Sequence, residues 1–210
     1  MLKCDSMKRI LLVNPPIYDF TAYDFWLRPY GLLSVGGLFR DKAELLLFDY
    51  MDRWGYEGFK SGGGKGVKNR VSKMGRRRYG RGSYRKRRVA KPGVFGDVPR
   101  HFYRYGRKRE EFREFLKGAG DVDLVLTSAV MTYWYPGLVE VLEDVRELQC
   151  GARIAVGGGY ASLCGEHCRE NIEADLVLEG RGLEELFSFA GIAGVGGYKL
   201  PYWEGYEGLT

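Results

Sequence analysis

The sequence predicts a three-layer α/β domain: a doubly wound parallel sheet of five strands, helices on both faces, and a basic, Gly-rich insert. The first observation is that short apolar runs alternate with amphipathic segments along the chain, as they do in βαβ units. The second is that 210 residues, 45% of them hydrophobic, describe one soluble globular domain. Right-handed crossovers then favour a doubly wound, Rossmann-like (flavodoxin-like) arrangement. Five strands fit its order 2-1-3-4-5, but the sequence alone does not specify that order.

Five apolar runs have the length and composition of buried strands. They are Arg9–Asn14, Glu44–Phe48, Asp123–Thr127, Arg153–Val156 and Ala174–Leu178. Five further segments carry apolar residues at helical spacing: Pro29–Asp41, Arg107–Gly118, Tyr135–Gln149, Ala161–Asn171 and Leu183–Phe189. The residues from Gly191 onward are rich in Gly and aromatic residues and have no periodicity.

One segment differs in composition from the rest of the chain. Between Gly58 and Gly96 there are 14 Lys or Arg, ten Gly and no Asp or Glu, while the remainder carries 19 basic and 27 acidic residues, a net charge of −8. Such a segment cannot bury enough apolar surface to offset the entropy lost on ordering. We therefore expect residues 58–96 to be a flexible loop within an α/β domain of residues 1–190, and residues 191–210 to be a tail or linker.

Composition also excludes several classes of protein. No apolar run reaches about 18 residues, so no transmembrane helix and no membrane partner are expected. The polar N-terminus, Met1 to Arg9, does not resemble a signal peptide. Four cysteines are too few for a disulfide scaffold, which favours a cytoplasmic location.

The predicted topology indicates where a ligand would bind. In a doubly wound sheet, ligands lie beyond the carboxyl ends of the strands, which selects the loops Asn14–Tyr18, Ser128–Tyr133, Gly157–Tyr160 and Glu179–Gly182. The triple glycine would let a bulky ligand approach the backbone, or would simply form a tight turn. Asn14 could offer an amide or cap a turn. Aromatic residues after the third strand suit a planar partner, although they pack more often than they bind cofactors.

Other chemistries lack their sequence motifs. No P-loop occurs, and the first β–α turn has prolines where a dinucleotide fingerprint needs glycine, which disfavours ATP and NAD. Cys164 and Cys168 are at helical spacing with His167 between them, so metal binding is conceivable. Asn171 stands where a third cysteine would be needed, and buried free cysteine is common, which favours packing. We predict no catalytic and no metal-ligating residue, because no triad or carboxylate pair is found.

The loops together resemble a known family. The segments KRILLVNPP, RPYGLLSVGGLFRD, TSAVMTYWYPGLVEVLEDVREL, RIAVGGGYASLCGEHC and ADLVLEGRGLEELF are similar to the N-terminal cobalamin-binding domain of B12-dependent radical SAM proteins. The likeness runs from Lys8 to about Phe189, apart from the basic insert. Its specificity lies in the order NPP, a Ser-containing loop, GGG and EGRG after successive strands.

This resemblance implies a cobalamin-binding module, with the corrin held over the strand ends, that serves a radical SAM reaction of the methyltransferase type. It implies four groups of cofactor contacts: beside the corrin, Asn14, Pro15 and Pro16; near the nucleotide tail or ring edge, Ser128, Met131 and Thr132; along the tail, Gly157, Gly158, Gly159 and Tyr160; closing the pocket, Glu179, Gly180 and Gly182.

Two family motifs are missing. The D-x-H-x-x-G motif of the methionine synthase type is absent, so no histidine is available there for cobalt, and no C-x-x-x-C-x-x-C occurs. The expected catalytic partner is therefore a radical SAM barrel in cis or in trans, and S-adenosylmethionine and a [4Fe-4S] cluster are expected only with that barrel. The chain is then a fragment, a split subunit or a stand-alone carrier.

Two alternative functions remain open at this point. Residues 60–91 could bind nucleic acid, because Met74–Arg88 interleaves arginines with tyrosines and glycines, as RNA-binding tracts do. A flexible, solvated loop would have the same composition. The chain could also be a degenerate Rossmann-like domain with a purely structural role.

Overall fold

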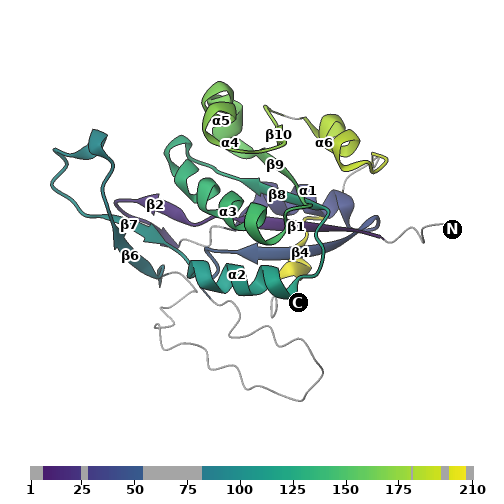
Figure 1. The fold of residues 1–210 in the computed structure, drawn as a ribbon, viewed down its shortest axis with the longest axis horizontal. Coiled ribbons are helices and arrows are strands. Elements are labelled where there is room, and N and C mark those ends of the chain that lie inside the picture. Colours follow the sequence, from purple (N-terminus) through teal and green to yellow (C-terminus); the bar gives the residue numbers. More distant parts are fainter. Residues whose placement is uncertain (1–6, 25–27, 54–81, 181, 195–198, 207–210) are drawn as a thin grey trace, which may run out of the picture.

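A central parallel sheet organises the chain (Figure 1). The computed structural model describes residues 7–24, 28–53, 82–180, 182–194 and 199–206. The sheet has five strands, all parallel, in the order β10-β9-β8-β1-β4. Their bounds are β1 Lys8–Asn14, β4 Ala43–Asp49, β8 Leu124–Ser128, β9 Arg153–Gly157 and β10 Leu176–Val177. The predicted α/β class with a five-stranded parallel sheet is confirmed, and counted along the chain the order is the flavodoxin-like 2-1-3-4-5.

Helices cover both faces of this sheet because the inner strands are apolar on both sides. In β1, Leu11 and Val13 belong to one buried cluster and Ile10 and Leu12 to the other. The first face packs against α2 (Arg109–Gly118), α3 (Tyr135–Leu148), α4 (Gly158–Leu163) and α5 (Gly165–Asn171), and the second against α1 (Tyr30–Phe39) and α6 (Leu183–Ala190). The three-layer prediction is therefore correct.

The helix predicted over Ala161–Asn171 is two helices. The first begins at Gly158, so that two of the three glycines are helical, and the second follows a break at Cys164, where φ is −135° and ψ is 48°. A Cβ on Gly165 would lie 2.3 Å from Glu179 Oε1. The break therefore fits the close approach of the loop after β10, which helical spacing alone does not reveal.

Two small antiparallel sheets lie beside the main sheet, and the prediction missed both of them. One has the order β2-β7-β6 and the other pairs β3 with β5. Their strands are β2 Ile17–Asp19, β3 Tyr23–Asp24, β5 Gly82–Ser83, β6 Lys86–Val89 and β7 Phe102–Tyr105. Short 3-10 turns lie at Gly93–Phe95, Thr132–Trp134 and Trp203–Gly205.

The structure corrects the predicted loop over residues 58–96 from Gly82 onward; residues 58–81 lie outside the described ranges. β6 pairs antiparallel with β7 although its side chains are mostly exposed and basic. Backbone hydrogen bonds need no apolar side chain, and charges suit an edge strand. Tyr84 anchors the segment, because it is buried against Met51 and Tyr105. Local composition therefore did not indicate strand β6, because it is defined by pairing with β7 further along the chain.

The described part of the tail packs onto the main domain. Tyr202 N–H donates to the Leu33 carbonyl (2.9 Å) and its hydroxyl to the Leu45 carbonyl (3.0 Å). Tyr206 is buried at the end of β4. Residues 199–206 thus contribute to the fold next to α1 and β4. Within the described ranges, none of the helices has the length and apolar character needed to cross a bilayer.

Candidate functional site

The order of the strands reverses between β1 and β8, which are neighbours in the sheet although β4 lies between them in the chain. Loops diverge at such a point, and ligands of doubly wound folds bind there. The register aligns Asn14 with Asp49 and Ser128 with Gly157. The sheet therefore brings the loops after β1, β8 and β9 to one edge, together with the loop after the neighbouring strand β10.

The loop after β1 is covered by α3. Pro15 and Pro16 are buried, and a Cβ on Gly137 would lie 2.0 Å from the Pro16 carbonyl oxygen. Asn14 Nδ2 donates to Asp49 Oδ1 at 2.6 Å. The amide of Asn14 and the faces of both prolines are thus engaged within the protein.

The triple glycine packs against the loop after β8. Gly158 has a φ of +88°, and its Cβ would lie 2.9 Å from the Ala129 carbonyl oxygen. A Cβ on Gly159 would lie 2.4 Å from the Val130 carbonyl oxygen. Tyr160 N–H donates to the Ala129 carbonyl at 3.0 Å. Contact between the two loops is sufficient to account for the glycines at positions 158 and 159, as the tight-turn alternative expects.

Large apolar side chains are exposed where β8 and β9 end. In the loop after β8, Val130 is 67%, Met131 44% and Tyr133 47% exposed. Thr132 begins the 3-10 turn of this loop, and Trp134 Nε1 donates to Asp19 Oδ2 at 2.9 Å. At the end of α4, Leu163 is 76% exposed. The edge thus presents apolar surface to solvent on loops that are fixed by hydrogen bonds.

Tyr160 is buried in the core beneath the loop after β8. Its ring stacks on Tyr135 with a centroid distance of 5.8 Å, and its hydroxyl lies 2.8 Å from His167 Nδ1. Burial raises the pKa of Tyr160. Cys168 lies in the same core and Cys164 packs against it, so packing accounts for both cysteines. In the described ranges, no three His, Cys, Asp or Glu side chains form a group that could hold a metal ion.

The loop after β10 is joined to α4 and α5. Gly180, with a φ of +72°, donates its N–H to Ser162 Oγ at 3.0 Å. Glu179 pairs with Arg169, and Gly182 caps α6. A Cβ on Gly180 would meet no atom within 4 Å, so this glycine faces open space.

Prediction from the sequence missed a buried polar cluster at the end of β4. Asp49 accepts three hydrogen bonds: from Asn14 Nδ2, from Met51 N–H (2.8 Å) and from the Tyr206 hydroxyl (2.6 Å). Arg28 Nη1 lies 3.8 Å from Asp49 Oδ2, and its guanidinium lies over the Tyr206 ring. The sequence offers one signal for this cluster, the acidic residue Asp49 at the end of the second predicted strand. Tyr206 gives no such signal, because it comes from a segment without periodicity.

Burial raises the pKa of Asp49 above its ordinary value, and the hydrogen bonds from Tyr206 and Asn14 oppose this rise. The neighbouring carboxylate of Asp52 adds to the rise, whereas Arg28 also opposes it. Burial likewise raises the pKa of Tyr206. The Tyr206 hydroxyl therefore stabilises the ionised form of a fully buried carboxylate.

Replacing Tyr206 by phenylalanine should lower the free energy of unfolding by about 1.5–2 kcal/mol at pH 7, because a charged acceptor loses its donor. Without that donor the pKa of Asp49 rises further. The loss is therefore full above the pKa of Asp49 and shrinks as the pH falls and Asp49 takes up a proton. Urea unfolding of both proteins between pH 4 and 7 measures this difference. Tyr202→Phe is the control, because its hydroxyl donates to a neutral carbonyl and its loss should not vary with pH.

Comparison with known protein families and with curated proteins gives no match for this chain. The fold and the loop geometry are therefore the observations that bear on its function.

Proposed function

We propose that this chain is a cobalamin-binding domain of a B12-dependent radical SAM system, and that the apolar loop after β8 contacts the cofactor. The observation that carries the proposal is the exposure of Val130, Met131 and Tyr133 at the point where the strand order reverses. A flavodoxin-like sheet with an apolar edge suits a large, flat ligand. The ordered NPP, Ser-loop, GGG and EGRG segments point to the same class of cofactor.

The residues at this edge fit a corrin, which is a broad, largely apolar ring with amide groups at its rim. Val130, Met131 and Tyr133 would contact the ring, and the hydroxyls of Ser128 and Thr132 would bind polar groups at its rim. Gly180, which faces open space, leaves room for the nucleotide tail. Gly158 and Gly159 would act by holding the apolar loop in place, since their surfaces pack against it.

Cobalamin would supply the methyl donor, and this chain would supply the binding surface. Neither histidine of the sequence lies on the four loops: His167 is on α5 and His101 precedes β7. The loops therefore offer the cobalt no imidazole. S-adenosylmethionine and an iron–sulfur cluster would belong to a radical SAM barrel, in cis or in trans, because this sequence has no C-x-x-x-C-x-x-C.

The direct test is to incubate the purified protein with hydroxocobalamin, desalt it and record the corrin absorption spectrum. Met131→Glu should raise the Kd at least roughly tenfold, because the charge opposes burial of a side chain worth about 1.5–3 kcal/mol. The melting temperature should not change, since Met131 is exposed in the free protein.

Met7→Glu is the matched control. Met7 is 63% exposed and precedes β1, at the opposite, amino edge of the sheet. Its substitution should leave the Kd within twofold of the wild type. A protein that stays colourless with every cobalamin form would contradict the proposal and leave a structural α/β domain. If both substitutions weaken cobalamin binding equally, the loop after β8 is not the binding site.

A further inference from the structure

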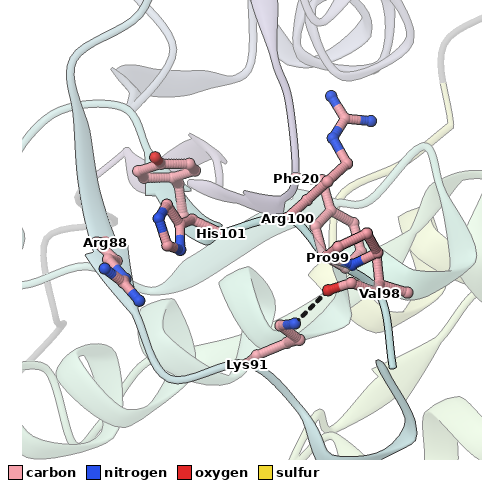
Figure 2. Close-up of a pocket in the computed structure, with 8 residues that line it drawn as sticks. Phe20, Arg88, Lys91, Val98, Pro99, Arg100 and His101 are labelled. Atoms are coloured by element: carbon pink, nitrogen blue, oxygen red, sulfur yellow. Dashed lines mark hydrogen bonds between the residues drawn. The ribbon is translucent and has the colours of Figure 1, made fainter. Parts of the chain in front are cut away.

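An open hollow of about 570 Å³ lies on the β2-β7-β6 sheet and is lined by none of the residues placed in the proposed cobalamin site. Arg88, Lys91, Arg100 and His101 line it together with the rings of Phe20 and Tyr103. Figure 2 shows Arg88 and His101 on one side, Phe20, Val98 and Pro99 on the other, and the Lys91 ammonium between them, turned toward Val98. The Arg100 guanidinium points away from this space.

The surroundings of the hollow are strongly basic. Residues 82–108 hold nine Lys or Arg and one acidic residue, Asp97; Arg85, Arg104 and Arg107 pair with glutamates of α2 and α3, which leaves six basic residues outside those pairs. Lys91 Nζ donates to the carbonyl of Val98 at 2.5 Å, so its charge is held in place without a carboxylate. No ion pair within the described ranges involves Arg87, Arg88 or Arg100. Their positive charge is therefore available to an anionic ligand.

Basic side chains continue beyond the hollow along one strand. Lys86, Arg87 and Arg88 are exposed residues of β6, which is an edge strand of its sheet. Side chains alternate along a strand, so Lys86 and Arg88 share the face of Tyr103 and Arg87 lies on the other face. A row of cations along an extended strand suits a chain of phosphates better than a single phosphate. Because the cations are spread along the strand, this surface differs from a pocket that binds one small anion.

Aromatic rings supply the second half of the chemistry. Phe20 is held edge-on by Phe95 and Phe102, with centroid distances of 5.4 and 5.1 Å, so this wall is rigid. The exposed imidazole of His101 stands edge-on to Tyr103 at 6.4 Å. Unpaired bases stack on such rings at about 1–3 kcal/mol per base, whereas bases within a duplex cannot reach them.

We propose that the hollow and the adjacent face of β6 bind single-stranded RNA. Arg88 and Lys91 contact phosphates, and one base enters the hollow against His101 and Phe20. The proposal is independent of the cobalamin site, because the two share no residue.

A labelled twelve-nucleotide single-stranded RNA and the full chain test this by fluorescence anisotropy at several salt concentrations. Arg88→Glu should raise the Kd about tenfold and lower the salt slope by about 1, as expected for a lost phosphate contact. His101→Ala should weaken binding without changing the slope. Arg153→Glu, with the same charge change at the amino end of β9, should alter the Kd less than threefold.

Photocrosslinking with 4-thiouridine RNA locates the site, which matters because residues 60–81 contain nine Lys or Arg of their own. Crosslinks to a peptide spanning residues 98–105 would support the proposal. Crosslinks confined to residues 60–81 would overturn it, as would equal weakening by Arg88→Glu and Arg153→Glu. Uridine monophosphate or heparin binding as tightly as the strand would also overturn it, in favour of a mononucleotide site or a general polyanion surface.

Discussion

Replacing Glu140 by alanine is expected to lower the free energy of unfolding by about 3–5 kcal/mol, because it leaves a buried arginine without its counter-charge. Glu140 of α3 and Arg104 of β7 are each 5% exposed. Arg104 donates through Nε and Nη2 to the two carboxylate oxygens at 2.7 and 2.5 Å, and the Tyr18 hydroxyl donates to Oε2 at 2.7 Å. Urea unfolding at pH 7, followed by circular dichroism, measures the loss.

Burial tends to raise the pKa of Glu140, but the hydrogen bonds from Arg104 and Tyr18 outweigh it, so that the pKa lies below its ordinary value. The charged pair therefore fastens the β2-β7-β6 sheet onto α3 at neutral pH. Because the pKa is lowered in the folded protein, this contribution is present above the ordinary pKa and is lost as the pH falls through the folded one.

Glu143→Ala provides the control for this prediction. Glu143 is on the same helix and pairs with Arg109 at 2.8 Å, but its side chain is 56% exposed. Its loss should cost under about 1 kcal/mol. The double variant Arg104→Met/Glu140→Leu should recover much of the stability, because it removes both buried charges. A Glu140→Ala protein as stable as Glu143→Ala would show that the pair does not hold the small sheet.

Gly137→Ala is expected to have the second large effect on stability. It should destabilise the protein, although helix propensity alone predicts stabilisation. Alanine favours a helix over glycine by up to about 1 kcal/mol, and Gly137 lies in the first turn of α3. However, the new Cβ would lie 2.0 Å from the Pro16 carbonyl oxygen, which is backbone and cannot rotate away. Displacing the helix or the Asn14–Pro16 segment should destabilise the protein by about 3 kcal/mol. Thermal unfolding measures the change.

Gly31→Ala is the matched control, because Gly31 lies in the first turn of α1 and its Cβ would meet no atom within 4 Å. This substitution should leave stability unchanged or raise it by up to about 1 kcal/mol. If both substitutions shift the melting temperature in the same direction, the close contact between α3 and the loop after β1 is not rigid. The same pair of variants tests whether this contact matters for the proposed site, since displacement of α3 would also move the loop after β8 that leads into it and should weaken cobalamin binding.

Most of the main sheet could be predicted from the sequence. The run from Ile10 to Val13 is apolar on both sides of a strand, which is typical of a parallel sheet with helices on both faces. Once the class was parallel, the handedness of the crossovers limited the strand order. The four loops at the carboxyl edge followed from that order, without knowledge of any side-chain contact.

The doubly wound fold and the edge at which its loops meet could be predicted from local patterns, because periodicity and strand handedness are local properties. Which residues of those loops are exposed depends on contacts that form only in the folded protein. In the folded protein Tyr160 is buried and Asn14 donates a hydrogen bond to Asp49. Gly159 packs against Val130, whereas Met131 is exposed. Folding also pairs β6 with β7 and brings Tyr206 to Asp49. These are contacts between residues far apart in the chain, and no local pattern specifies them.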